Sequence, residues 1–302
     1  MHVFYSDHYT IDLPEGHRFP MRKYRMLRYA LVDAGIITEE ELRDAPLIDR
    51  EDLLLAHTER YVDGVIHGTL DRLEQRRIGF PWTPSLVTRS MATVGGCLAS
   101  ARAALEDGIS GNLAGGTHHA MRDAGEGFCV FNDIAVATLK LMQEDRIRTA
   151  LIIDLDVHQG NGNSDILGGR PDVTIFSMHG AKNYPFRKIA STIDVDLPDG
   201  TGDEAYLRIL GDHLPHLLDR KPDIAFYQCG VDPLEHDALG RLAMTFDGLM
   251  ERDRMVLQAC HDRHVPVMLA LGGGYADPID NTIQAQLNTY RVATHFASSN
   301  VR

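Results

Sequence analysis

The chain has 302 residues, of which 44% are hydrophobic and 24% charged, and these globular proportions exclude disordered, collagen-like and low-complexity proteins. Its formal net charge of −13 argues against a nucleic-acid-binding protein, which needs a basic face for phosphates, whereas a cationic substrate would be tolerated. No apolar run is long enough to span a membrane, and the first residues lack the pattern of a secretory signal.

The four cysteines are scattered and form no C-x-x-C pair. Neither a disulfide framework nor a zinc ribbon is expected, and a reducing compartment fits this usage. The sequence also shows no nuclear targeting signal and no tail, which fits a compact cytoplasmic protein of bacterial type. No repeat and no Pro/Gly/Ser linker divides the sequence, so we expect a single domain over residues 1–302.

Short apolar runs alternate with longer amphipathic segments, which predicts an α/β fold: an open, mostly parallel sheet with helices on both faces. In chain order, the predicted strands are Val3–Tyr5, Asn112–Ala114, Ala150–Leu155, Val173–Ser177, Thr192–Val195, Ile224–Gln228 and Val265–Leu271. The predicted helices are Met21–Ala34, Pro84–Glu106, Asp133–Gln143, Gly202–Leu218 and Phe246–His261. Ligands of such sheets bind beyond the carboxyl ends of the strands, so we expect the active site there.

Two adjacent histidines, His118 and His119, follow the second predicted strand. A chain with 15 histidines contains such a pair by chance, so two ordinary loop histidines are an open alternative. Gly115 and Gly116 precede the pair and allow close backbone approach. This setting favours a functional role without establishing one.

The pattern D-x-D-x-H ends the apolar strand that begins at Ala150 and consists of Asp154, Asp156 and His158. Alternate side chains of an extended segment share one face, so all three point the same way. A buried carboxylate without a partner is unfavourable, and a metal ion would supply that partner. A helix-capping or salt-bridged aspartate pair is the alternative.

Asp232 follows another predicted strand, where a turn role before Pro233 is the alternative. With Asp156 and His158 it completes a set of two carboxylates and one imidazole. Three protein ligands leave a fourth position open, as in a catalytic zinc site, although ferrous iron or manganese would compete for carboxylate ligands. Such a metal predicts hydrolysis of an amide or ester.

Three glycines, Gly272–Gly274, follow the last predicted strand and precede Tyr275. They do not form the G-x-G-x-x-G fingerprint, and Pro278 interrupts the segment where a phosphate-binding helix would begin. The flexible glycines suit a Tyr275 phenol that donates a hydrogen bond to an oxyanion. A tight turn followed by a core tyrosine is the alternative.

Taken together, these motifs resemble the zinc-dependent histone deacetylase family. The matching segments are Gly115–Ala120, Gly127–Asp133, Asp154–Gly162, Asp232 and Gly272–Tyr275. The match runs in order through most of the chain, and Asp154–Gly162 and Tyr227–Leu242 look most like the class IV branch and its bacterial relatives. The resemblance implies an arginase/deacetylase-like fold and a metal-dependent amidohydrolase that removes acyl groups from lysine.

The resemblance also implies the ligands and the pocket wall. The residues that match the zinc ligands are Asp156, His158 and Asp232. A structural potassium ion is implied at Asp154, Asp156, His158, Ser177 and Met178. The implied substrate-binding residues are Gly127, Phe128, Tyr184 and Gly273, although the loop Gly180–Lys188 that holds Tyr184 aligns poorly.

By the same resemblance, His119 is the general base, and His118 assists it electrostatically or delivers a proton. Asp154 orients His118, Asn161 orients His119, and Tyr275 stabilises the oxyanion. Asp154 is anionic whereas Asn161 is neutral. We therefore predict a higher pKa for His118 than for His119.

Several alternatives remain. An arginase-type ureohydrolase with two manganese ions needs a further carboxylate, and a non-catalytic binding module has no use for His118, His119 and Tyr275 together. Within the family, acetylpolyamines and other small acylated amines compete with acyl-lysine in a protein or peptide, and class IV relatives favour long fatty-acyl chains. The basic loop His17–Lys23 either lies near the pocket mouth or covers a helix. The sequence predicts no oligomeric state.

Overall fold

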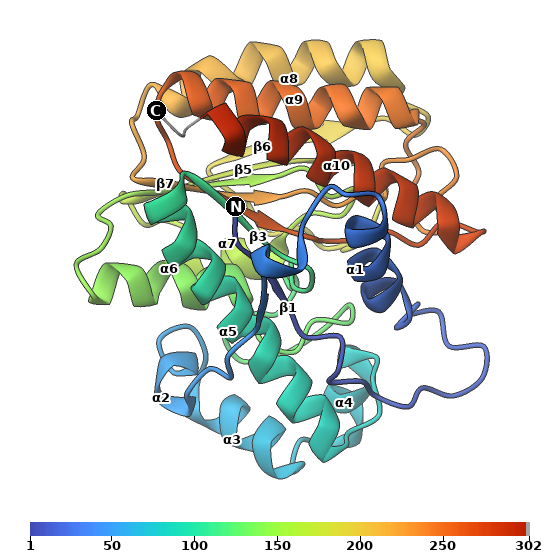
Figure 1. Cartoon of the computed structure of the whole chain (residues 1–302). Helices are drawn as coiled ribbons and strands as arrows, with labels where there is room; N and C mark the ends of the chain where they lie inside the picture. The colour runs from blue at the N-terminus through green and yellow to red at the C-terminus, as the bar shows by residue number, and fades with distance from the viewer. Residues whose placement is uncertain (300–302) are drawn as a thin grey trace.

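The computed structural model describes residues 1–299, and side chains up to residue 297. Eight strands form one sheet in the order β2-β1-β3-β8-β7-β4-β5-β6, and every pairing between neighbours is parallel (Figure 1). The strands are β1 Val3–Tyr5, β2 Leu42–Asp44, β3 Ile109–Asn112, β4 Ala150–Asp154, β5 Val173–Gly180, β6 Ile193–Leu197, β7 Ile224–Gln228 and β8 Val267–Ala270. This confirms the predicted open parallel α/β fold.

Helices cover both faces of the sheet (Figure 1). The helices are α1 Lys23–Asp33, α2 Arg50–Leu53, α3 Glu59–His67, α4 Arg72–Ile78, α5 Pro84–Asp107, α6 Asp133–Gln143, α7 Asn161–Leu167, α8 Asp203–Leu218, α9 Phe246–Asp262 and α10 Ile279–Ser299. α8, α9 and α10 pack side by side on one face, with α1 against α10, whereas α5, α6 and α7 lie on the other. No helix within residues 1–299 is long and apolar enough to cross a membrane.

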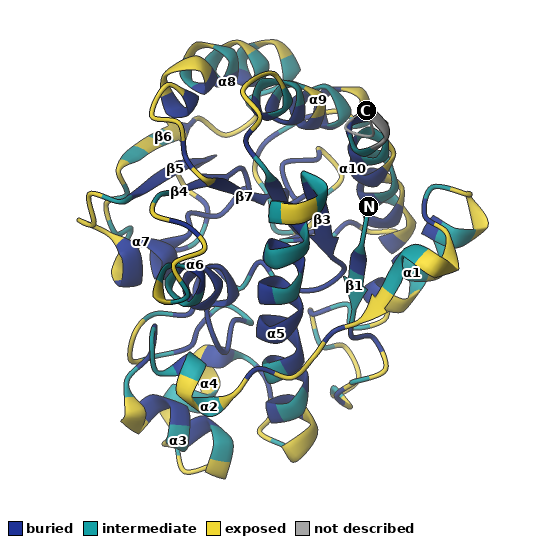
Figure 2. Cartoon of the chain, turned by 60° about the vertical axis from the view of Figure 1, so that its left-hand side comes forward, coloured by how far each residue is buried: buried dark blue, intermediate teal, exposed yellow. Residues whose placement is uncertain are grey.

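The central strands and α5 form the interior of the molecule (Figure 2). Every residue of β4 and β7 is buried, as expected for strands covered by helices on both faces. α5 begins at the cap residue Thr83, whose hydroxyl accepts the Leu86 N–H at 3.1 Å. At Gly95 any Cβ would lie 1.9 Å from the Pro46 carbonyl oxygen, so only glycine allows this close packing.

The carboxyl ends of four strands lie in one row. Asn112 pairs with Ala270, Ala270 with Gln228, and Gln228 with Asp154. Because all strands are parallel, the segments that follow β3, β8, β7 and β4 leave the sheet at the same edge. This row positions every segment of the candidate site.

Some predicted bounds were wrong. The strand predicted at Asn112–Ala114 lies instead at Ile109–Asn112, because pairing with β1 and β8 overrides the weak strand preference of Ser110 and Gly111. β5 extends to Gly180, so Met178 lies within the strand. The elements not predicted are β2, α2, α3, α4, α7 and α10, of which α10 begins directly after Pro278.

Candidate active site

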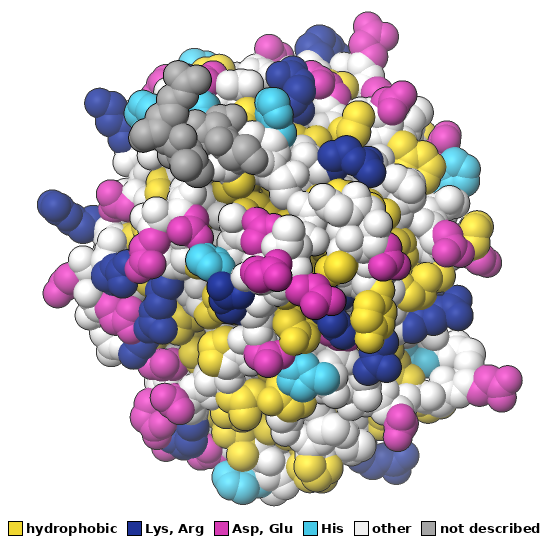
Figure 3. Space-filling model, in the orientation of Figure 1, with side chains coloured by type: hydrophobic (Ala, Val, Ile, Leu, Met, Phe, Trp, Pro, Cys, Tyr) yellow, Lys and Arg dark blue, Asp and Glu magenta, His cyan; other side chains and the backbone are white. Residues whose placement is uncertain are grey.

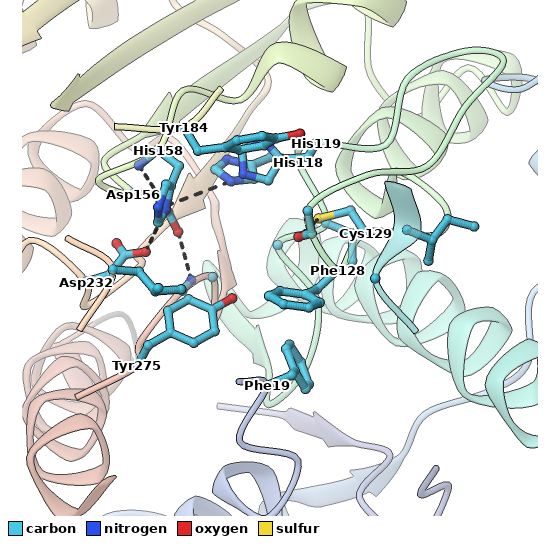
Figure 4. Close-up of a pocket in the computed structure, with 18 of the residues that line it drawn as sticks. Phe19, His118, His119, Phe128, Cys129, Asp156, His158, Tyr184, Asp232 and Tyr275 are labelled. Carbon is cyan, nitrogen blue, oxygen red and sulfur yellow. Dashed lines mark hydrogen bonds and ion pairs between the residues drawn. The ribbon is translucent and has the colours of Figure 1, made fainter. Parts of the chain in front are cut away.

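Three buried side chains at the carboxyl edge of the sheet form a candidate metal centre. One ligand atom from each of Asp156, His158 and Asp232 lies within 4.8 Å of the others. His158 Nδ1 lies 3.0 Å from Asp156 Oδ1 and 3.1 Å from Asp232 Oδ2 (Figure 4). Across the described side chains this is the one such group of three or more His, Cys, Asp or Glu residues.

Backbone N–H groups hold both carboxylates in place. The Gly273 N–H donates to Asp156 Oδ2 at 2.8 Å, and the Val157 N–H donates to Asp232 Oδ1 at 2.8 Å. A Cβ at position 273 would lie 2.0 Å from Asp232 Oδ2, so only glycine fits there. Each carboxylate thus has one oxygen fixed by the backbone and the other beside His158.

The electrostatics of this group favour a bound cation. Burial and the neighbouring charge of Asp156 raise the pKa of Asp232 to about 7. Burial opposes protonation of His158, but its hydrogen bonds to both carboxylates prevail and raise its pKa to about 10. A divalent cation would relieve the repulsion between the Asp156 and Asp232 carboxylates. The set of two carboxylates and one imidazole fits zinc.

Asn161 fixes the tautomer of His119. The Asn161 Nδ2 group donates to Glu126 Oε1 at 2.7 Å, which leaves Asn161 Oδ1 to accept the His119 Nδ1 proton at 2.8 Å. His119 Nε2 therefore carries a free lone pair. Burial and the nearby His118 and His158 hold the pKa of His119 well below its usual value.

His118 lies in the opposite charge environment. Its Nδ1 atom lies 2.8 Å from Asp154 Oδ2, and its ring centroid lies 4.1 Å from that of His119. Burial lowers the pKa of His118, but the Asp154 and Asp156 carboxylates outweigh burial and raise it to about 9. The direction agrees with the order of pKa values expected from the sequence.

Tyr275 is held through its backbone and its ring, so its hydroxyl stays available. Its N–H donates to Asp237 Oδ2 at 2.6 Å, and Lys23 Nζ lies 4.9 Å from the ring centroid while donating to the Gly274 carbonyl at 3.3 Å. Burial raises the pKa of the phenol well above its usual value, so Tyr275 stays protonated. Within the described part of the chain, no residue accepts its O–H, which points towards Phe128 (Figure 4).

The pocket wall contains a strained backbone. Phe128 has φ +66° and follows Gly127 at φ +59°, and a left-handed conformation costs an L-residue about 1–2 kcal/mol. The N–H of Phe128 donates to the Ile78 carbonyl at 2.9 Å, which holds this conformation. The ring then packs against Phe19 and Phe80 at centroid distances of 5.3 Å and 5.4 Å. Strain retained at a pocket wall is typical of functional sites.

Tyr184 lines the same pocket and stacks edge-on against His119, with ring centroids 5.0 Å apart. The pocket has a volume of about 710 Å³. It reaches from the exposed Phe186 to Ser90 and Thr93 of α5 in the interior. Arg18 and Phe19 line it, so the basic loop His17–Lys23 lies at the pocket.

The structure brings most of the residues expected from the sequence to this pocket. They are Gly127, Phe128, Tyr184, Gly273, Tyr275, His118, His119, Asp156, His158 and Asp232, with Asp154 and Asn161 behind the two histidines. The Gly273 N–H is engaged by Asp156. Ser177 pairs with Asp154 across β5 and β4, and the potassium ion implied there stays a prediction.

Sequence reasoning missed four supporting residues: Lys23, Glu126, Asp237 and Arg252. The buried Arg252 donates to the carbonyls of Leu155 at 3.3 Å and Gly230 at 2.7 Å, which joins the ends of β4 and β7. Its position three residues after the buried Leu249 and four before the buried Val256 is a helical signal for a buried charge.

Comparison with known proteins decides the family, because the histone deacetylase domain model matches residues 17–290. The chain belongs to the histone deacetylase family. An uncharacterised protein of Picosynechococcus is 44% identical over 292 residues, which cover 96% of this chain and 97% of that protein. Histone deacetylase 2 of Arabidopsis thaliana is 31% identical over 309 residues, which cover 92% and 78%.

A solved structure shows the same fold. The crystal structure of a histone deacetylase homologue from Aquifex aeolicus has a TM-score of 0.80 and 21% identity, covering 99% of this chain and 84% of that one. The chain is therefore a hydrolase of the histone deacetylase family with the fold of its solved relatives.

Proposed function

We propose that this histone deacetylase-family hydrolase is a metal-dependent lysine deacylase related to the class IV branch. The observation that carries the proposal is the position of His119, whose free Nε2 belongs to a ring 5.9 Å from that of the candidate ligand His158. His119, the three candidate ligands and Tyr275, whose hydroxyl is free, all line the same pocket. We also propose that residues 1–302 form one cytoplasmic catalytic domain.

Asp156, His158 and Asp232 are the residues that would hold zinc, with ferrous iron as the competing metal. Such an ion supplies Lewis acidity towards water and the acyl carbonyl. A structural potassium ion at the Asp154–His158 segment and Ser177–Met178 belongs to the same proposal.

The protein's own groups move the protons. His119 Nε2 accepts a proton from the attacking water, whose oxygen bonds to the acyl carbon. Tyr275 donates a hydrogen bond to the oxyanion that develops on the acyl oxygen. His118, charged beside Asp154, gives its proton to the leaving nitrogen as the C–N bond breaks. The products are a carboxylic acid and a free lysine amine.

The size and the apolar lining of the pocket support an acyl group longer than acetyl. Besides the candidate ligands, its lining includes apolar side chains such as Phe80, Leu86 and Phe131. Apolar area of this kind stabilises bound methylene groups by about 0.8 kcal/mol each. Long-chain defatty-acylation is therefore our favoured reaction, ahead of plain deacetylation.

A small acylated amine, such as an acetylpolyamine, is the second candidate substrate because it requires the same chemistry. A two-manganese ureohydrolase receives less support, because the described side chains contain a single group of three ligands. The free Tyr275 hydroxyl and His119 lone pair argue against a binding module.

The test is kcat/KM on an acetyl-lysine peptide, a long-chain acyl-lysine peptide and N-acetylputrescine, with Asp156→Ala measured in parallel. We expect the long-chain peptide to be preferred and the variant to be inactive. Preference for acetylputrescine would move the protein to the small-amine alternative. Turnover that survives in Asp156→Ala would contradict the metal-dependent mechanism.

A further inference from the structure

The mouth of the pocket is cationic. Five exposed basic side chains line it, and they come from four separate segments. They are Arg18 before α1, Arg76 and Arg77 in α4, Lys182 after β5 and Arg241 before α9. We propose that this ring selects acyl-lysine flanked by acidic residues, an inference that rests on the proposed deacylase function.

Most of this charge has no partner in the protein. Lys182 and Arg241 share one carboxylate, Asp199, at 3.5 Å and 3.3 Å. Among the described residues, Arg18, Arg76 and Arg77 have no carboxylate within 4.0 Å. Unpaired guanidinium groups at a pocket opening are suited to bidentate binding of a carboxylate from outside.

The acidic residues that line the pocket, among those the structure describes, would offset little of this charge once a metal is bound. The two acidic residues that line the pocket are Asp156 and Asp232, and a bound cation would neutralise both. The carboxylates in the interior therefore do not attract a cationic substrate once the metal centre is filled.

The sign of the mouth is opposite to that of the chain as a whole. The net charge is −13, and the face shown in Figure 3 mixes acidic with basic side chains. Clustered charge at a cleft concentrates the field there, so the local sign governs which substrate enters. Net charge alone suggests tolerance of cationic substrates, whereas the proposed ring favours negatively charged groups at the pocket itself.

The positive charge at the mouth argues against two classes of substrate. Acetylpolyamines keep at least one positive charge, and basic peptide tails of the histone kind place lysine and arginine beside the acylated residue. Both would be repelled by Arg76 and Arg77. Phe186, 86% exposed on the same rim, adds an apolar surface for a neutral part of the peptide.

The experiment measures kcat/KM on three peptides with the same acyl-lysine and the same length, flanked by three glutamates, three serines or three arginines. At low salt we expect roughly tenfold preference for acidic over neutral flanks and a similar loss with basic flanks, both shrinking at 0.5 M salt. The double variant Arg76→Glu with Arg77→Glu should reverse the order of kcat/KM between the glutamate-flanked and arginine-flanked peptides.

The matched control is Arg148→Glu with Arg208→Glu, which changes two exposed arginines outside the pocket by the same total charge. It should keep the wild-type order, and thermal melting checks that both double variants fold. Equal rates on the three peptides, or a preference for basic flanks, would overturn the selectivity while leaving the deacylase function intact. No turnover of any acyl-lysine peptide would overturn the proposed function, and the inference with it.

Discussion

The floor and the mouth of the pocket are built in opposite ways. At the floor, the polar side chains are buried and paired: Asp156 and Asp232 accept backbone N–H groups, and Asp154 and Asn161 contact the two histidines. At the mouth, the charged side chains are exposed, and Arg76 and Arg77 have no carboxylate partner in the described part of the chain.

This difference between floor and mouth suggests that the floor carries out the reaction, whereas the mouth selects among substrates. A floor whose groups hold one another presents the same geometry to every acyl amide, so changes there should alter turnover for all substrates alike. A mouth with free charges gains its partners only from a substrate, so changes there should alter the ranking of substrates. The following predictions test this division, from the largest expected effect to the smallest.

The largest effect is expected at the metal ligands. Asp156→Asn removes one negative charge from the cluster while nearly preserving side-chain volume, so we expect loss of the bound metal and a fall in turnover of about 10³-fold or more, since a metal supplies several kcal/mol to the transition state. Metal content per chain and kcat report the two losses. If the variant loses activity equally on all three flanked peptides, the floor sets turnover and not substrate ranking. A changed ranking of the three peptides would contradict this separation of roles.

Tyr275→Phe removes one hydroxyl and leaves the Asp237 contact to the backbone in place. Loss of a single oxyanion donor lowers kcat by roughly 10²–10³-fold, and we expect this fall with unchanged metal content. Measuring kcat and KM separately distinguishes the two roles, since a substrate-binding tyrosine would instead raise KM.

His57 holds the backbone next to the pocket floor, and we expect its ionisation to change the free energy of unfolding. Its Nδ1–H donates to the Met121 carbonyl at 3.0 Å, and Nε2 accepts the Asn132 N–H at 2.9 Å, so both nitrogens are used by the neutral ring. Burial lowers its pKa to about 4. Asp133, which follows Asn132, accepts the backbone N–H groups of Gly116 and Thr117, directly before His118 and His119.

Because the unfolded chain binds this proton near pH 6.5 and the folded chain near pH 4, the neutral ring stabilises the fold fully above pH 6.5. That stabilisation, about 3 kcal/mol, is lost as the pH falls from 6.5 to about 4. Urea unfolding at pH 7 and pH 5 measures the loss, and His57→Gln should flatten this part of the pH dependence. An unchanged slope in the variant would assign the acid sensitivity to other groups.

The smallest effect is expected at Glu126, which holds the Asn161 amide in its orientation. Glu126→Leu removes the acceptor, so Asn161 can turn its nitrogen towards His119, and we expect kcat to fall by about 10–100-fold. Glu126→Gln keeps an acceptor oxygen and is the matched control, with a smaller fall. Equal losses in both variants would point to the charge of Glu126 and not to its orienting role.

The sequence was sufficient for the parts whose signal is local. Continuous apolar runs identified β4 and β8, and the alternation of Asp154, Asp156 and His158 placed these three residues at a strand end. Short helices such as α3 and α4 were not predicted, because their stability depends on packing and not on a long periodic pattern.

Most of the mouth could not be predicted for a different reason. The basic loop His17–Lys23, which holds Arg18, drew attention in the sequence, but Arg76, Lys182 and Arg241 lie far apart and nothing near them marks them as its partners. Only the parallel packing of the strands brings their segments to one opening. Glu126 is similar, since its partner Asn161 is 35 residues away.

The order of the strands has a consequence for how the candidate site is assembled. β8, the last strand in the sequence, lies between β3, which leads to His118 and His119, and β7, which leads to Asp232. Without β8 the sheet would divide into two halves, one leading to His118 and His119 and the other leading to the candidate metal ligands. β8 thus joins the two parts of the candidate site, and we expect a chain truncated before Val267 to lack the assembled pocket and to show no turnover.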